Sequence, residues 1–156
     1  MCTMIVRKVV RSQYQGLVDQ AAQMIGNVAV PKEGWIRVVR KAFGMSGAQL
    51  AKRLGMTRAA VSSKELAELS GSITIKKMHQ LAEALNCRFV YAVVPQASVQ
   101  SIIDNRAREK ALSIVQKANQ QMALEDQSLS KSQIASEIDR VQEEILRNFD
   151  SEFWND

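Results

Sequence analysis

The segment 46–63 has a spacing of small and apolar residues that suits few folds. Ala51 is followed four residues later by Gly55 and six further on by Val61. Where two short helices meet at a tight turn, a small residue lets the second helix cross the first. A glycine supplies the positive φ of the turn, and an apolar residue anchors the second helix in the core. This spacing therefore predicts a helix-turn-helix motif.

The same segment supplies the other signals that the motif needs. Leu50 and Leu54 lie four residues apart and would form the buried face of the first helix. Thr57 precedes the second helix and is a good N-cap. We expect the second helix, which begins near Arg58, to be the one that enters a DNA groove.

Two further helices are predicted around the motif. The first begins at Trp35 and ends at Gly44. Its inward residues are expected to be Trp35, Val38, Val39, Ala42 and Phe43, and its outward residues Arg37, Arg40 and Lys41. After a loop over 71–74, Thr74 caps another helix that closes at Asn86. The apolar face of this helix is formed by Ile75, Met78, Leu81, Ala82 and Leu85.

Residues 87–94 are rich in β-branched and aromatic side chains and are followed by Pro95, a pattern that predicts a strand. A single strand leaves its backbone groups unpaired, and no second strand is evident in the sequence. We therefore expect this strand to pair with its copy in a second subunit. A two-fold dimer also suits the reading of a palindromic DNA site.

The ends of the chain are predicted to be helical as well. Residues 5–25 fit an N-terminal helical arm that is broken near Gly16. Residues 98–122 and 130–149 fit a helical hairpin, with a polar break at 125–128 and a Ser130–Gln133 capping box. Phe153 and Trp154 near the end indicate that the tail docks on something.

The predicted fold class is mainly α, with a phage-repressor-like helix-turn-helix domain, one strand and a C-terminal helical hairpin. We divide the chain into an N-terminal arm and linker at 1–33, a DNA-binding domain at 34–95, and a hairpin for dimer or partner contacts at 96–156. The 156 residues are enough for a small domain with such an appendage.

Charge is distributed unevenly along the chain. Residues 1–95 contain 14 Lys and Arg against 5 Asp and Glu, a net charge of +9, whereas 96–156 contain 7 against 11, a net charge of −4. A basic front half and an acidic tail suggest that one part meets a polyanion and the other a protein. No apolar run approaches the roughly 18 to 20 residues of a membrane span, and no signal peptide is evident, so we expect a soluble, cytoplasmic protein.

The predicted site residues lie at the start of the second motif helix and at nearby helix N-termini. For base contacts we name Arg58, Ala59, Ser62 and Ser63, with Arg58 donating to guanine and Ala59 contacting a thymine methyl. For phosphate contacts and their support we name Thr57, Ser46, Gly47, Gln49, Lys76 and Lys77. The other basic residues of this region, Lys52, Arg53, Arg37, Arg40 and Lys41, are expected mostly to be solvated surface.

Catalytic and metal-binding patterns are not evident. His79 and Cys87 could form a nucleophile pair, but His79 lies in an amphipathic helix and no orienting carboxylate or oxyanion loop accompanies it. The two cysteines are too isolated for a zinc site or a disulfide framework. We therefore predict a non-enzymatic protein that needs no cofactor or metal.

Several runs resemble the mobile mystery protein A family. The resemblance is carried by 34–37, 40–46, 71–75, 82–87 and 90–95, and by the tail segment 122–129, so that it extends over nearly the whole chain. Members are small helix-turn-helix proteins that are typically encoded beside a Fic-domain protein. The resemblance therefore implies a regulator in a toxin-antitoxin-like pair.

One position departs from the usual pattern of such domains. An apolar residue commonly precedes a glutamate after the recognition helix, whereas here Lys64 precedes Glu65. Either the Lys64 stem lies along the surface with its ammonium in water, or the helix is rotated so that Leu66 and Leu69 fill the core. Arg58 is less affected by this choice.

The sequence thus predicts a dimeric, sequence-specific DNA-binding transcription regulator that represses its own operon. Its expected partners are double-stranded DNA with a palindromic operator, a second copy of the chain, and a Fic-domain protein. The alternative is an antitoxin that acts mainly by binding and neutralising the Fic-domain partner through the tail hairpin.

Overall fold

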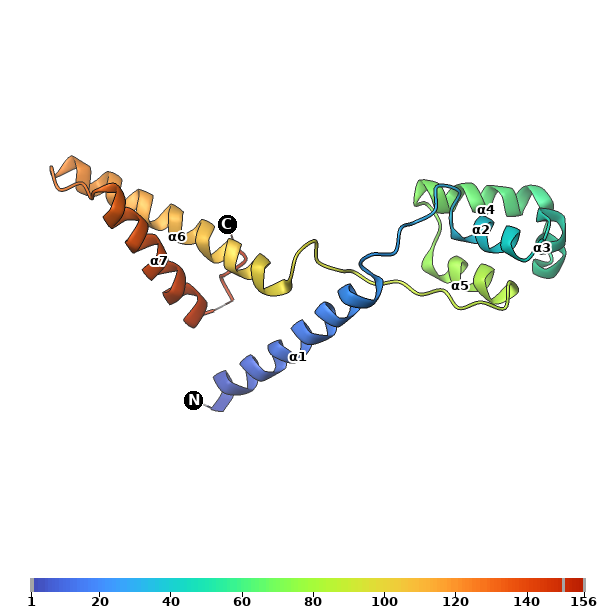
Figure 1. Ribbon diagram of the computed structural model, residues 1–156, viewed down its shortest axis with the longest axis horizontal. Coiled ribbons are helices and arrows are strands. Elements are labelled where there is room, and N and C mark those ends of the chain that lie inside the picture. The colour runs from blue at the N-terminus through green and yellow to red at the C-terminus, as the bar shows by residue number, and fades with distance from the viewer. Residues whose placement is uncertain (1, 150, 156) are drawn as a thin grey trace. The chain divides into compact units, whose positions relative to one another are not determined.

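The computed structural model describes residues 2–149 and 151–155, and over these residues it is helical (Figure 1). The helices are α1 (Cys2–Ile25), α2 (Trp35–Ala42), α3 (Gly47–Leu54), α4 (Arg58–Ser70), α5 (Ile75–Ala84), α6 (Val99–Leu124) and α7 (Lys131–Arg147). They form two compact units, one of residues 24–93 and one that joins residues 1–23 to 94–156. The predicted mainly helical class is confirmed.

The unit of residues 24–93 is built from α2 to α5 around one apolar core. Leu50, Val61 and Leu81 are at most 1% exposed, and Ala51 is 2% exposed. The small Ala51 side chain lies in the same core cluster as Val61 of α4, which is the close approach of α3 and α4 that the spacing predicts. The buried part of the helix-turn-helix prediction is therefore confirmed.

The helix ends in this unit follow the predicted local signals. Gly55 ends α3 with φ of 63°, the left-handed conformation that glycine adopts without strain. The Thr57 hydroxyl accepts from the Ala60 N–H at 3.1 Å, and the Thr74 hydroxyl accepts from the Lys77 N–H at 3.1 Å. Both threonines are therefore the N-caps that the sequence indicates.

The predicted facing of α2 was right for Val39, Arg37 and Lys41 and wrong for Trp35, Phe43 and Arg40. Ile36 is buried and Val39 packs on the core, whereas Trp35 and Phe43 are 37% and 59% exposed. Ile36, Val39 and Arg40 share a helix face at the i, i+3, i+4 spacing, and that face contacts the core and α4. The buried face of α2 is therefore rotated from the predicted one, because Arg40 points inward to the Glu65 carboxylate of α4 rather than outward to water.

The strand predicted at 87–94 is not formed in the structure, and none of the described residues is assigned to a strand. The segment runs without regular structure after α5, with Val93 91% exposed. A strand is stabilised by a ladder of hydrogen bonds to a neighbouring strand, and the described chain supplies no such neighbour. Phe89 and Tyr91 instead stack with ring centroids 5.7 Å apart.

The second unit contains the predicted helical hairpin. Figure 1 shows α6 and α7 side by side, and their apolar faces form two clusters. The first cluster has Ile103, Ala107 and Phe153 at its centre, and the second has Ala111, Val115 and Ile138. The Ser130–Gln133 capping box at the start of α7 is confirmed by reciprocal hydrogen bonds of 2.9 and 3.3 Å.

The final described residues fold back onto α6. Phe153 is 2% exposed, and its carbonyl accepts from the Arg106 Nε at 3.4 Å. The Lys110 Nζ donates to the carbonyls of Glu152 and Asn155 at 2.9 and 2.8 Å. Phe153 therefore docks within its own unit, while the neighbouring Trp154 is 53% exposed.

The N-terminal helix α1 differs from its prediction because it continues through Gly16. A helical glycine costs only about 1 kcal/mol, which the rest of a long helix can absorb. α1 contacts the rest of its unit through Arg11 and Asp19. The Arg11 guanidinium lies 3.8 Å from the centroid of the Phe149 ring, and Asp19 accepts from the Val99 N–H at 3.2 Å at the start of α6.

None of the described helices is both long and apolar enough to span a bilayer.

Candidate nucleic-acid interface

The first two turns of α4 present one side to solvent. Arg58, Ala59, Ser62 and Ser63 are all exposed, whereas Val61 is buried at 1% exposure. Ala59, Ser62 and Ser63 lie on the sides of α4 that are turned away from Val61, and Arg58, three residues before Val61 in the first turn, is exposed as well. The structure therefore brings together, on one accessible surface, the residues predicted for base contacts.

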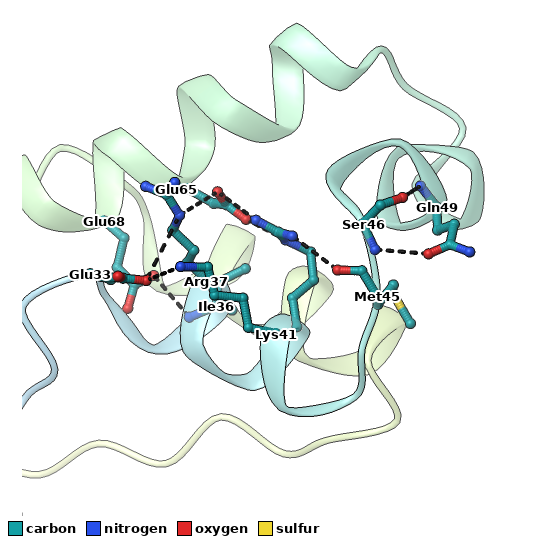
Figure 2. Close-up of polar contacts among 10 residues, drawn as sticks. Glu33, Ile36, Arg37, Lys41, Met45, Ser46, Gln49, Glu65 and Glu68 are labelled. Atoms are coloured by element: carbon teal, nitrogen blue, oxygen red, sulfur yellow. Dashed lines mark hydrogen bonds and ion pairs between the residues drawn. The ribbon is translucent and has the colours of Figure 1, made fainter.

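An ion pair between α2 and α4 sets how α4 lies on the domain. The Arg40 Nε donates to Glu65 Oε1 at 2.7 Å and its Nη2 donates to Oε2 at 3.2 Å. The side chains of Arg40 and Glu65 are only 11% and 9% exposed, and the Arg40 Nη1 also donates to the Met45 carbonyl at 2.9 Å. Figure 2 shows the Glu65 carboxylate pointing from α4 toward α2. The pair links α4 to α2 and to the loop before α3.

A second glutamate of α4 caps α2. The Glu68 carboxylate accepts from the backbone N–H groups of Trp35 and Ile36 at 2.5 and 3.1 Å. These are N–H groups of the first helical turn, which have no partner within the helix. Gly34 precedes them with φ of 81°, and a Cβ at this position would lie 2.9 Å from Glu68 Oε2. Glycine at 34 is thus needed both for the backbone conformation and for the approach of Glu68.

The sequence reasoning missed the roles of Arg40, Glu65 and Glu68. Glu65 follows Val61 by four residues and so occupies the same core-facing stripe of α4, a signal that an acidic residue there needs a buried partner. The partner lies 25 residues away in the sequence, and residue types alone do not identify it. Arg40 is therefore not a solvated surface residue.

The Arg40–Glu65 pair also explains why α4 has Lys64 where such domains usually have an apolar residue. Lys64 is half-buried, Glu65 is the buried residue, and Leu66 and Leu69 are 61% and 50% exposed. The alternative in which Leu66 and Leu69 fill the core is wrong, because the core position belongs to the carboxylate held by Arg40.

The predicted phosphate contacts around α3 lie next to the start of α4. Ser46 and Gln49 form a capping box, in which the Gln49 N–H donates to the Ser46 hydroxyl at 3.2 Å and the Ser46 N–H donates to Gln49 Oε1 at 2.8 Å (Figure 2). A Cβ added at Gly47 would lie 3.8 Å from the Arg58 Cγ, so the Arg58 side chain passes beside the N-terminus of α3. Ser46, Gly47 and Arg58 are therefore neighbours.

The remaining basic residues are arranged differently. Lys76 is exposed and Lys77 half-buried in the first turn of α5, behind the Thr74 cap. Lys41 is exposed but donates to Glu33 at 2.7 Å, which lowers the pKa of that carboxyl below its ordinary value, with a smaller contribution from Arg37. Lys41 and Arg37 thus have acidic neighbours, whereas Lys76 sits at a helix N-terminus, where anions are favoured.

His79 packs with aromatic side chains. Its ring meets the edge of the Phe89 ring at a centroid distance of 5.4 Å and that of Tyr91 at 6.3 Å. The Cys87 thiol donates to the Leu85 carbonyl at 3.3 Å. Within the part of the chain that is described, no three His, Cys, Asp or Glu residues gather as metal ligands.

Comparison with known proteins bears on this part of the chain. No curated protein and no solved structure matches the sequence. Residues 36–91, which include α2 to α5, match the family model described as Helix-turn-helix. Residues 36–91 are therefore a helix-turn-helix domain, the DNA-binding domain of transcription regulators.

Proposed function

We propose that this protein is a dimeric transcription regulator that reads a palindromic operator through α4. The observation that carries the proposal is the exposed set Arg58, Ala59, Ser62 and Ser63, presented by a helix whose other side is held by Val61 and Glu65. Arg58 can donate two hydrogen bonds to guanine in the major groove, and Ala59 can contact a thymine methyl. The two serines would contribute less specific contacts.

Phosphate contacts would hold α4 in register. The N-termini of α3, α4 and α5 carry the positive ends of helix dipoles, and Ser46, Gly47, Thr57, Lys76 and Lys77 lie in or next to these first turns. Gln49 supports this arrangement by closing the Ser46 cap, which keeps the α3 N-terminus formed. Such contacts fix orientation and carry no sequence information of their own.

Selection of duplexes from a randomised library with the full chain tests this proposal. We expect a palindromic consensus whose half-sites are about 34 Å apart, because two-fold related recognition helices meet the groove one turn apart. Arg58→Ala should lose preference at one base pair of each half-site. The control is Lys117→Ala, which removes one positive charge, as Arg58→Ala does, but at an exposed position of α6 outside the helix-turn-helix domain. It should leave the consensus unchanged. A library that stays random would contradict the proposal.

The regulatory setting comes from the family resemblance. Proteins of the mobile mystery protein A family are typically encoded beside a Fic-domain protein, which supports repression of a shared toxin-antitoxin-like operon. The proposed autorepressor would occupy DNA upstream of its own gene and exclude transcription.

A second candidate function is an antitoxin that neutralises a Fic-domain partner. The observation that favours it is the hairpin of α6 and α7, which has its own apolar clusters and lies in the acidic part of the chain. A chain ending at residue 95 separates the two functions. If the protein acts only as a regulator, the full chain and the shortened chain both leave the activity of the Fic-domain partner unchanged. If the protein acts as an antitoxin, the full chain inhibits the partner and the shortened chain does not.

A further inference from the structure

A groove lies between α1 and α6, within the unit that joins residues 1–23 to 94–156. α1 contributes Val10, Tyr14 and Val18 to its lining, and α6 contributes Ile102 and Ile103. The groove has a volume of about 580 Å³. Sites for small molecules commonly have volumes of about 300–1,000 Å³ and are lined mostly by apolar side chains, so this groove has the size and the composition of such a site.

The contacts that hold α1 in its unit do not fill this space. Arg11 stacks on Phe149 and Asp19 accepts from the Val99 N–H, yet none of residues 3–25 is buried. Helices that pack directly on one another interdigitate their side chains at the density of a protein interior. The side chains of α1 and α6 instead leave an apolar space open between them, and this space can take an apolar occupant.

The charged side chains of the groove are both cationic. Arg7 and Arg11 line it, no described acidic side chain does, and neither arginine has a carboxylate partner among the described residues. The two arginines are four residues apart on one helix face, so their guanidinium groups repel each other. Arg11 stacks on Phe149 through the face of its guanidinium, which leaves the N–H groups at its edge able to donate. An anion between the two arginines would accept from both and offset their repulsion.

The groove is elongated, and its charge lies toward one end. Its lining residues on α1 extend from Val6 to Val18, a length of about 18 Å at 1.5 Å per residue. Arg7 and Arg11 lie in the first half of this length, whereas the other end, at Val18, is the end that meets Val99. The matching occupant has an anionic head at one end and a linear apolar chain behind it.

We propose that the groove binds the anion of a linear fatty acid, with its carboxylate between Arg7 and Arg11 and its chain along the apolar walls. A guanidinium can donate two parallel hydrogen bonds to one carboxylate, and burial of the chain removes apolar surface from water.

The occupant is a free acid rather than a membrane surface, because α1 lacks the single apolar face of a helix that lies on a bilayer. Met4, Ile5 and Val6 are 61%, 60% and 54% exposed, and consecutive residues of a helix point about 100° apart. The exposed apolar side chains of α1 therefore surround the helix, and the groove is the place where apolar and cationic groups converge.

Titration calorimetry of the full chain with sodium decanoate, kept below the concentration at which it forms micelles, tests the site. We expect one molecule to bind per chain. Decanol has the same chain without the charge and acetate has the carboxylate without the chain, so both should bind at least about tenfold more weakly. Equal binding of decanol and decanoate, several decanoate molecules per chain, or no binding of decanoate would overturn the proposal.

Two matched pairs of variants locate the bound acid. Arg7→Gln removes a donor to the carboxylate while Arg11 keeps its place on Phe149, and it should raise the Kd for decanoate at least about tenfold. Lys8→Gln removes a cation from the next position, which does not line the groove, and should leave the Kd unchanged.

Val10→Trp fills part of the groove and should weaken binding as strongly as Arg7→Gln does. Val9→Trp is its control, because Val9 is 53% exposed and does not line the groove. Circular dichroism checks that each variant keeps its helices. Equal effects within either pair would mean that binding follows net charge or general stickiness rather than this groove, and would overturn the proposal.

Two further measurements identify a different occupant. A chain that self-associates in sedimentation velocity and fails to bind decanoate has the groove covered by a second copy. A chain that cosediments with phosphatidylserine vesicles, loses this in Arg7→Gln and fails to bind decanoate uses the groove at a membrane. Either result overturns the proposal. None of these measurements involves DNA, so their outcome does not bear on the proposed regulator function.

Discussion

At the scale of single residues, the orientation of α4 depends on Glu65. Glu65→Ala would leave the Arg40 guanidinium in the domain interior without its two carboxylate hydrogen bonds. Breaking one side of a buried pair is costly, and we expect the free energy of unfolding to fall by about 3 kcal/mol. Trp35 fluorescence during urea unfolding, in a Trp154→Phe background, reports on this unit.

The control for this change is Glu137→Ala. Glu137 bonds to Arg140 on the surface of α7, and exposed pairs contribute little to stability. Its urea midpoint should stay at the wild-type value. If Glu65→Ala is as harmless as Glu137→Ala, the ion pair does not hold α4 in place.

Two glycines give opposite predictions for one substitution. Gly34→Ala forces an L-residue to φ of 81° and puts a Cβ 2.9 Å from Glu68 Oε2, so it should destabilise the domain by about 1–3 kcal/mol. Gly16→Ala, inside α1 with no atom within 4 Å of the added Cβ, should instead stabilise the chain by about 0.5–1 kcal/mol. Thermal unfolding followed by circular dichroism measures both. A Gly34→Ala change that does not destabilise the domain would contradict the constraint described at residue 34, and a destabilising Gly16→Ala change would contradict the prediction for α1.

At the scale of elements, Phe153 fastens the chain's last residues to the hairpin. Phe153→Ala empties a fully enclosed site between α6 and Phe149, and we expect a loss of about 3–5 kcal/mol in the unfolding free energy of this unit. Trp154 fluorescence in a Trp35→Phe background follows it. Leu124→Ala, at an 88% exposed position of the same unit, should change little. Similar losses for both would mean that Phe153 is not part of the core.

The sequence predicts helices best where local chemistry determines them. Thr57, Thr74 and Ser130 mark helix starts by hydrogen bonds to residues three positions on, and Gly55 marks an end by its φ, so these boundaries depend on adjacent residues alone. The apolar spacing of α3 to α5 and of the hairpin likewise predicts their packing faces.

The errors arose where a distant partner decides the outcome. The inward turn of Arg40 depends on Glu65, and the capping of α2 depends on Glu68, each far away along the chain. Residues 87–94 have the composition of a strand but lack a neighbouring strand in the described chain. Continuity of α1 through Gly16 shows that one glycine is too weak a signal to end a long helix. The exposed face of α4 was predicted, whereas the contacts that orient it were not.

At the scale of the whole molecule, we assign DNA binding to one unit and partner contacts to the other. The unit of residues 24–93 contains the helix-turn-helix domain, and the unit with α1, α6 and α7 carries the acidic tail. DNA binding by such a molecule is driven largely by release of counterions from phosphate, so log affinity should fall by about 0.9 per neutralised phosphate for each decade of salt.

The most direct measurement is a fluorescence-anisotropy titration of the full chain on duplex DNA from upstream of its own gene. Scrambled competitor and two salt concentrations, about 50 and 200 mM, separate specific from purely electrostatic binding. The account predicts preference for the upstream sequence, a steep salt dependence, and a loss of about 1–3 kcal/mol of binding free energy in Arg58→Ala. Equal affinity for the scrambled duplex, or no binding at either salt concentration, would contradict sequence-specific reading by α4.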